Sequence, residues 1–234
     1  MRTLMSNSFR TTNSTGLINK DKKINFTFNG TIYHGYEGDT LASALIANGV
    51  HLVGRSFKYH RPRGFLGVGV EEPNAMVQLH DGNKSEPNII ATEVELVEGL
   101  KAKSQNCWPS VQFDIGEINN VLNRFFPAGF YYKTFMWPKS FWMKIYEPFI
   151  RKAAGMGKAP LLPDPDRYEH NYEHCDVLVV GSGPSGLASA LAAAKNGARV
   201  ILAEDKPNFG GSLLTDEVTI GNMSGKEWAS DTIS

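Results

Sequence analysis

Hydrophobic positions follow two patterns, an alternating one near the start of the chain and a continuous one after residue 175. The run Ile24-Asn-Phe-Thr-Phe28 alternates apolar and polar side chains, as a strand with one buried face does. Asn29-Gly30 is a strong signal for a tight turn, and a second strand is expected at residues 31–34. The first part of the chain therefore opens with a predicted β-hairpin.

A short helix is predicted directly after the hairpin. Asp39 is a good N-cap, apolar residues follow at helical spacing, and Gly49 stands where the helix would end. Residues 75–79 and 89–96 are candidates for the remaining strands of the same sheet. Two strands in a hairpin followed by a capped helix resemble the opening of a β-grasp ferredoxin-like domain, which is an analogy at the level of the fold.

The continuous pattern begins at residues 177–180, where four apolar residues in a row are typical of a parallel strand buried on both faces. A glycine-rich turn, Gly181-Ser-Gly-Pro-Ser-Gly186, follows at once, and an alanine-rich helix then runs to a predicted C-terminal cap at Gly197. Residues 199–203 form a second apolar strand that ends at Glu204. This order predicts the first βαβ portion of a Rossmann-type dinucleotide-binding domain.

Each residue type in this segment has a physical reason. Gly181 allows a sharp turn, Gly183 lets backbone approach a pyrophosphate, and Gly186 lets the helix pack close to the strand. The Glu204 carboxylate can accept ribose hydroxyls and would repel a 2′-phosphate, which favours NAD or FAD over NADP. The candidate cofactor-binding residues are Gly181, Ser182, Gly183, Pro184, Ser185, Gly186, Glu204, Asp205, Lys206, Gly210, Gly211 and Ser212.

The dinucleotide domain is expected to be truncated. Only 30 residues follow Glu204, and residues 215–234 are polar and offer no second βαβ unit. Gly210-Gly211 resembles the paired-glycine turn that follows the second strand in flavoproteins with two dinucleotide-binding domains, although such a pair alone is more often a simple turn.

Composition limits the remaining function classes. The chain has 234 residues, 41% of them hydrophobic, which fits one to two globular domains. Lys and Arg together number 24, as do Asp and Glu, so the overall charge predicts neither nucleic-acid nor membrane binding. Two cysteines cannot form a disulfide framework and suggest a reducing cytoplasm. Residues 1–22 lack a hydrophobic signal core and are predicted to be disordered.

The loop at residues 54–64 contains no cysteine, whereas a plant-type iron–sulfur centre needs a cluster of thiolates there. The predicted ferredoxin-like domain is therefore cysteine-free in its cluster loop. Cations and aromatic residues occupy this loop instead, including Arg55, Lys58, His60, Arg61 and Arg63. Such a patch can clamp a cofactor phosphate or an acidic partner surface, and the alternatives are a solvated basic loop or a nucleic-acid contact.

The stretch of residues 125–144 is rich in aromatic side chains, but its prolines and lysines exclude a membrane-spanning helix. Interdomain core is the favoured interpretation, with subunit docking and a membrane-surface role as alternatives. A helix is expected at residues 142–154 and a linker after it. His170, His174 and Cys175 are assigned to that linker rather than to a metal site, and we predict neither a metal site nor catalytic residues in this chain.

These elements give a fold of the α+β class followed by one of the α/β class. The expected parts are a disordered start, a ferredoxin-like β-grasp domain without cluster ligands, an aromatic-rich connector and a partial FAD/NAD(P)-binding Rossmann domain. Their boundaries are placed at residues 1–22, 23–105, 106–172 and 173–234.

Long unusual strings carry a resemblance to a known family. They include Gly54-Arg-Ser-Phe-Lys-Tyr-His-Arg-Pro-Arg-Gly64, Glu72-Pro-Asn-Ala75, residues 125–138, Asp164-Pro-Asp-Arg-Tyr-Glu-His170 and the glycine turn. In this order, from about residue 24 to residue 213, the chain resembles the N-terminal part of the alpha subunits of heterotetrameric sarcosine oxidases.

The resemblance implies a complex that converts sarcosine, O2 and tetrahydrofolate into glycine, H2O2 and 5,10-methylenetetrahydrofolate. It implies NAD in this chain, FAD and covalent FMN on a partner subunit, and other subunits of beta, gamma and delta type as partners. The amine-oxidising residues would lie on another chain, so the isolated chain is expected to be inactive. The alternatives are a subunit of an FAD-dependent amine or opine dehydrogenase, against which the missing cysteines argue, and a nonenzymatic assembly or binding module.

Overall fold

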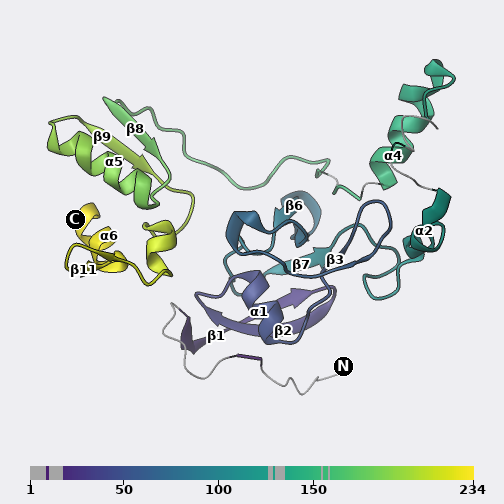
Figure 1. The fold of residues 1–234 in the computed structure, drawn as a ribbon, viewed down its shortest axis with the longest axis horizontal. Coiled ribbons are helices and arrows are strands. Elements are labelled where there is room, and N and C mark those ends of the chain that lie inside the picture. The colour runs from purple at the N-terminus through teal and green to yellow at the C-terminus, as the bar shows by residue number, and fades with distance from the viewer. Residues whose placement is uncertain (1–8, 11–17, 126–128, 130–134, 154, 158) are drawn as a thin grey trace. The chain divides into compact units, whose positions relative to one another are not determined.

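The computed structural model describes residues 9–10, 18–125, 129, 135–153, 155–157 and 159–234. The chain divides into two compact units, Met1–Arg167 and Tyr168–Ser234, which are described separately (Figure 1).

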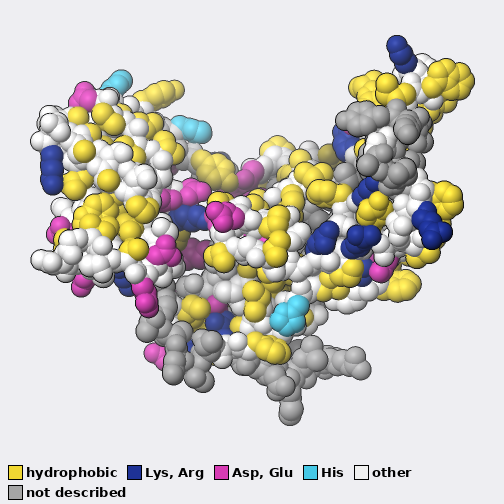
Figure 2. Space-filling model, in the orientation of Figure 1, with side chains coloured by type: hydrophobic (Ala, Val, Ile, Leu, Met, Phe, Trp, Pro, Cys, Tyr) yellow, Lys and Arg dark blue, Asp and Glu magenta, His cyan; other side chains and the backbone are white. Residues whose placement is uncertain are grey.

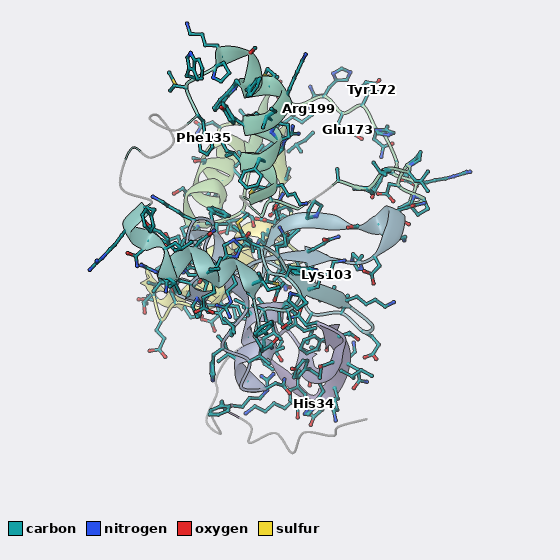
Figure 3. The ribbon with its side chains drawn as sticks, turned by 90° about the vertical axis from the view of Figure 1, so that its right-hand side faces the viewer. His34, Lys103, Phe135, Tyr172, Glu173 and Arg199 are labelled. Carbon is teal, nitrogen blue, oxygen red and sulfur yellow. The ribbon has the colours of Figure 1, made fainter. Side chains whose placement is uncertain are left out.

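A five-stranded mixed sheet forms the centre of the first unit (Figure 1). Its spatial order is β2-β1-β7-β5-β6, in which β1 and β7 are parallel and the other neighbours antiparallel. The strands are β1 (Asn19–Phe28), β2 (Thr31–Glu37), β5 (Met76–Leu79), β6 (Glu86–Ile90) and β7 (Lys101–Ser104). Figure 3 labels His34 on β2 and Lys103 on β7.

The predicted hairpin is confirmed. Asn29 and Gly30 connect β1 to β2 with φ values of 50° and 79°, the left-handed conformation that a two-residue type I′ turn requires. The first strand is longer than expected, because β1 begins at Asn19 and continues through a register irregularity between Asn19 and Lys23.

The helix after the hairpin is α1 (Leu41–Ala47), and its N-cap differs from the prediction. Thr40, not Asp39, is the N-cap, and it forms a capping box with Ser43. Asp39 is instead buried beneath the cap, where it accepts hydrogen bonds from the Tyr36 amide at 2.8 Å and the Ser43 hydroxyl at 2.7 Å and pairs with Arg10. A buried carboxylate persists only when donors surround it in this way.

The core of the first unit lies between α1 and the sheet. Phe26 and Phe28 come from β1, Val77 from β5, and Leu41 and Leu45 from α1, all with at most 2% of their surface exposed. Replacing a fully buried leucine by alanine costs about 2–5 kcal/mol in such a core. The alternation seen in the sequence of β1 therefore identified the buried face correctly.

The expected strand at residues 89–96 is wrong over most of its length. Strand β6 ends at Ile90, and the chain then leaves the sheet, with the Leu96 amide bonded to the Asp39 carbonyl at 2.9 Å. Val94 and Leu96 are apolar because they pack in the core, not because they belong to a ladder. The strand β7 was missed, because Lys-Ala-Lys-Ser has a single apolar residue, Ala102, to mark it.

Short elements make up the rest of this unit. Two-residue strands β3 (Gly54–Arg55) and β4 (Pro62–Arg63) pair across the basic loop. The helical turns are Gly69–Glu71, Gly82–Lys84, Ile115–Glu117, α2 (Ile118–Val121), Asn123–Phe125, Lys139–Phe141, a π-type turn Trp142–Tyr146 and α4 (Glu147–Ala153). The helix expected at residues 142–154 is thus present up to residue 153.

The aromatic segment does not form a core within the first unit. Trp137, Met143 and Phe149 are 82%, 72% and 66% exposed, and Figure 2 shows hydrophobic side chains over the α4 segment at the upper right. Residues 126–128 and 130–134 of the predicted aromatic stretch lie outside the described residues. Trp137 and Trp142 are therefore not part of the core of the first unit, and the interpretation of the stretch as interdomain core stays a prediction.

The second unit contains the predicted strand, helix and strand. Parallel strands β8 (Val177–Val180) and β9 (Val200–Ala203) are connected by α5 (Pro184–Lys195), with Gly197 at φ 84° after the helix. The later elements are a short helix Gly211–Leu214, a hairpin of β10 (Thr219–Ile220) and β11 (Met223–Ser224), and α6 (Gly225–Ile233). These later elements were not predicted, although Ser224 and Glu227 form a capping box that the sequence displays.

Strand β8 is less buried than its apolar sequence predicted. Leu178 and Val180 are 58% and 79% exposed. In the described part of the second unit β8 pairs with β9 alone, and the core consists of Leu187, Leu213 and Ala229 with Leu202, Ile220 and Trp228 packed against it. Burial on both faces, which a continuous apolar strand normally has, is therefore not observed.

Within the ranges that the structure covers, none of the helices has the length and apolar character needed to cross a bilayer. The linker before β8 is extended, and Tyr172, labelled in Figure 3, is 96% exposed.

Candidate functional site

The three glycines of the turn between β8 and α5 have different surroundings. Gly181 has a φ of 93°, which side-chain-bearing residues rarely adopt. A Cβ atom at Gly186 would lie 1.9 Å from the Gly181 carbonyl oxygen, so helix and turn could not pack as they do. A Cβ atom at Gly183, by contrast, would meet nothing within 4 Å. The fold itself thus requires Gly181 and Gly186, whereas Gly183 leaves open space at the start of the helix.

The N-terminus of α5 points its amide groups toward this open space. Gly183 is the N-cap and provides no side-chain cap, and Pro184 occupies the first turn, where it lacks an amide proton that would be unpaired anyway. The remaining first-turn N–H groups have no partner within the helix, and the helix dipole favours an anion there. Pro184 and Ser185 are exposed. The geometry therefore fits a pyrophosphate, with room that a side chain at Gly183 would fill.

Glu204 follows β9 and lies against the glycine turn. Its Oε2 accepts hydrogen bonds from the Ser182 amide at 2.7 Å and from the Ser182 hydroxyl, and its Oε1 accepts from the amides of Asp205 and Lys206 at 3.0 and 3.2 Å. These donors, those of Ser182 first, lower the pKa of Glu204 from 4.5 to about 2. The carboxylate is therefore ionised at neutral pH and held at the edge of the turn.

The paired glycines at positions 210 and 211 also reach the glycine turn. The Gly210 amide donates to the Ser182 carbonyl at 3.1 Å and to the Ser182 hydroxyl oxygen at 3.2 Å. A Cβ atom at Gly211 would lie 2.9 Å from the Gly183 Cα atom. The structure thus brings these segments together around Ser182, while Ser185 and Ser212 are exposed.

In the first unit, the basic loop is fastened to residues 111–117 by Arg55. This side chain is buried, with Nε donating to the Val111 carbonyl at 2.8 Å and Nη2 to the Gln112 carbonyl at 3.2 Å. Its Nη1 bonds the His60 carbonyl at 3.0 Å and pairs with Glu117 at 3.1 Å. Arg55 is therefore a structural residue whose guanidinium donors are occupied within the chain, and the prediction of a cofactor or partner contact remains for the other cations of the loop.

The other residues of the loop are partly engaged. His60 Nδ1 lies 2.6 Å from the Asp114 carboxylate, and Arg61 donates to the Asn120 side chain at 2.8 Å and stacks over the Tyr59 ring. Arg61 and Arg63 are nevertheless exposed. Arg61 and Arg63 are therefore the exposed cations of this loop.

Two cavities in the first unit were not foreseen from the sequence. One of about 190 Å³ is lined by residues that include Arg55, Arg63, Met76 and Asn88. A wider one of about 630 Å³ is lined by residues that include His60, Gln78, Cys107, Asp114 and Lys152. The residues that line each cavity come from segments far apart in the sequence, so no local sequence motif predicts either cavity.

Metal ligands do not gather in the parts of the chain that the structure describes: no group of three or more His, Cys, Asp and Glu side chains is placed to hold an ion there.

Comparison with known proteins places these features in a family context. Residues 21–107 match the family described as a 2Fe-2S iron-sulfur cluster binding domain, and residues 176–231 match the FAD dependent oxidoreductase family. Over 217 residues, 93% of its length, the chain is 57% identical to sarcosine oxidase subunit alpha of Rhizobium meliloti (strain 1021). The chain is homologous to sarcosine oxidase alpha subunits.

A second such subunit, from Corynebacterium sp. (strain U-96), is 33% identical over 199 residues, which is 84% of this chain. The chain spans 22% of the length of the Rhizobium meliloti subunit and 16% of that of the Corynebacterium subunit. Among solved structures, L-proline dehydrogenase from P.horikoshii matches with a TM-score of 0.47 and 18% identity, covering 95% of this chain and 32% of that one.

The segment homologous to iron–sulfur proteins does not fit a cluster. A [2Fe–2S] centre of the ferredoxin type needs four thiolates, and residues 21–107 contain one cysteine, Cys107. Burial, aided by the nearby Asp114 carboxylate, raises the pKa of the Cys107 thiol, which opposes formation of a thiolate ligand. The dinucleotide segment, by contrast, fits its family, since the Gly183 space and the uncapped helix N-terminus suit a cofactor phosphate.

Proposed function

We propose that this chain is the dinucleotide-binding and subunit-contacting part of a sarcosine oxidase-type oxidoreductase. The single observation that carries the proposal is its 57% identity with a sarcosine oxidase alpha subunit over 93% of the chain. The proposed reaction of the whole complex is oxidation of sarcosine by O2 with tetrahydrofolate as the one-carbon acceptor.

The proposed cofactor of this chain is NAD, with FAD as the alternative. Both carry an adenosine diphosphate with a free 2′-hydroxyl, which is the part that the glycine turn and Glu204 would hold. The α5 N-terminus would bind the pyrophosphate through its amides, and Gly183 would allow the close approach. The bound dinucleotide would supply hydride-transfer chemistry.

The chain's own residues would bind and orient rather than catalyse. In the second unit Glu204 is the carboxylate held at the glycine turn, and its low pKa makes it an acceptor of hydrogen bonds, not a proton shuttle at neutral pH. We place the amine-oxidising groups, the FAD and a covalent FMN on a partner subunit, and propose beta-, gamma- and delta-type subunits as partners. The ferredoxin-like first domain would serve as a scaffold without a cluster, and the second as the start of a Rossmann-type domain.

The cofactor assignment is tested by calorimetry with NAD, NADP and FAD. The protein is the 234-residue chain and, in parallel, a chimera in which it replaces the matching segment of the Rhizobium meliloti subunit. We expect NAD to bind more tightly than NADP and Glu204→Ala to weaken NAD binding. Equal affinities for NAD and NADP would refute the ribose assignment, and a retained flavin absorbance would select FAD instead of NAD.

A nonenzymatic assembly module is the second candidate, favoured by the exposed aromatic segment that carries Trp137 and Phe149. Exposed clusters of large apolar side chains mark interaction sites. Reversing the charge of Arg61 and Arg63 tests the contribution of the basic loop, because both cations are exposed. We expect reduced co-purification of the partner subunits of the chimera or reduced cofactor retention. An unchanged complex would make the loop a solvated surface.

A further inference from the structure

The two oxygens of the Glu204 carboxylate have different surroundings. Oε2 is held from the interior by Ser182, which has 0% of its surface exposed. Oε1 faces the turn formed by Asp205 and Lys206, both of which are exposed. Both oxygens accept two hydrogen bonds, but Oε2 is bonded to a buried residue, whereas Oε1 lies on the side of the exposed residues Asp205 and Lys206.

Ser182 is itself fixed, and the direction of its hydroxyl proton follows from its partners. The Gly210 amide can only donate, so the Ser182 hydroxyl oxygen accepts from it at 3.2 Å. The ionised Glu204 carboxylate can only accept, so the hydroxyl proton of Ser182 points to Oε2. The result is a relay from Gly210 through Ser182 to Glu204, in which each hydrogen bond polarises the next.

The carboxylate is already saturated in this arrangement. An ionised carboxylate offers about four lone-pair sites, and Glu204 has four donors. A ribose hydroxyl must therefore share or replace one of them. Of the three bonds whose lengths are given above, the longest is the 3.2 Å bond from the Lys206 amide to Oε1. Exchange is thus easiest at Oε1, while the contacts with Ser182 persist.

We infer that Ser182 is a positioning residue for adenosine recognition, which anchors Oε2 of Glu204 so that Oε1 and the negative charge meet the ribose 2′-hydroxyl position. This inference rests on the proposed dinucleotide function. A free glutamate side chain loses rotamer freedom when it binds, and Ser182 removes that cost before the ligand arrives. The same anchoring keeps the charge where a 2′-phosphate would lie, so Ser182 contributes to the selectivity for NAD over NADP.

Ser182→Ala removes the hydroxyl and keeps the backbone amide. The variant is expected to fold, because Gly210 retains the Ser182 carbonyl as an acceptor at 3.1 Å. Loss of one hydrogen bond to a charged group predicts about tenfold weaker NAD binding, with NADP binding little changed. Ser182→Cys, which keeps a weak donor of similar size, should give an intermediate ratio. Ser189→Ala, which removes an exposed hydroxyl farther along α5, is the matched control and should leave the ratio unchanged.

A spectroscopic measurement separates positioning from a merely structural role. With ¹³C-labelled glutamate, assigned by Glu204→Gln, the Glu204 carboxyl of the parent chain should stay ionised down to nearly pH 2, and Ser182→Ala should raise its titration midpoint. An unchanged midpoint would overturn the inference, as would an unchanged NAD-to-NADP ratio in a folded Ser182→Ala protein. If neither NAD nor NADP binds the parent, the proposed function fails, and the titration still decides whether Ser182 holds Glu204.

Discussion

Replacement of Arg55 by leucine should destabilise the first unit much more than replacement of Arg61 does. The Arg55 guanidinium donates to three backbone carbonyls, of Val111, Gln112 and His60, and pairs with Glu117. Leucine fills part of the volume but leaves these acceptors without their donor. An unsatisfied buried acceptor costs about 1–3 kcal/mol. Only the bond to the Val111 carbonyl is fully buried, whereas the other acceptors are partly open to water.

The Val111 carbonyl carries the full cost of an unsatisfied buried acceptor, and each of the other acceptors carries a fraction of that cost. Together they predict that Arg55→Leu lowers the free energy of unfolding by about 2–4 kcal/mol. Arg55→Lys keeps the charge but has fewer donors and a different shape, so we expect about half that loss. Arg61→Leu, which removes an exposed cation bonded to Asn120, is the control and should cost less than about 1 kcal/mol.

Urea unfolding followed by ¹⁹F NMR of fluorotryptophan measures these differences, because Trp108 lies beside the segment that Arg55 fastens and has its own resonance. The Trp108 amide bonds the Asp114 carboxylate, so its signal reports on that segment. Equal unfolding free energies for Arg55→Leu and Arg61→Leu would show that Arg55 does not fasten the loop and contributes no more to stability than an exposed arginine does.

Three further predictions concern the remaining sites. The folded pKa of Glu204 is lowered from 4.5 to about 2, so its contribution to stability is present above about pH 4.5 and is lost as the pH falls toward 2. The difference in unfolding free energy between the parent and Glu204→Gln should therefore close over that range, and a difference that stays constant down to pH 2 would contradict this reasoning. Gly183→Ala should leave thermal stability nearly unchanged and weaken dinucleotide binding, since its Cβ atom would meet nothing within 4 Å. Gly186→Ala should destabilise the second unit, because its Cβ atom would lie 1.9 Å from a backbone oxygen. Calorimetry measures the thermal stability and the dinucleotide affinity of both variants. Incubation with iron and sulfide should give no [2Fe–2S] absorbance, since Cys107 is the single thiol of the matching segment; a stable absorbing species would contradict the fit argument.

Local chemistry explains what could be predicted from the sequence. The Asn29-Gly30 turn and the glycine turn at residues 181–186 need backbone conformations that few residue types adopt. The residue types at these positions therefore predict the turns. The position of Glu204 at the end of β9 follows from parallel pairing of β8 and β9, which brings the ends of both strands to one edge.

Long-range packing explains what could not be predicted. Arg55 and Arg61 look alike in a run of cations, and only residues 111–120, folded against that loop, make one structural and leave the other exposed. Val94 and Leu96 alternate as a strand would, yet they are buried in the core of the first unit without belonging to a strand. In the sequence, Ser182 is only the residue between two glycines. Its hydrogen bonds with Glu204 and Gly210 are made across 22 and 28 positions of the chain, so the sequence does not predict them.

The position of β7 determines the order in which the first unit can fold. The hairpin of β1 and β2 and the pair β5 and β6 are each local in sequence, so each can form early. They join only through β7, where Thr27 is paired with Lys101 and Val77 with Ser104. Closing the long loop between β1 and β7 carries an entropic cost that local contacts do not repay. We therefore expect the two half-sheets to remain unjoined during synthesis until residues 101–104 are available to pair with both of them.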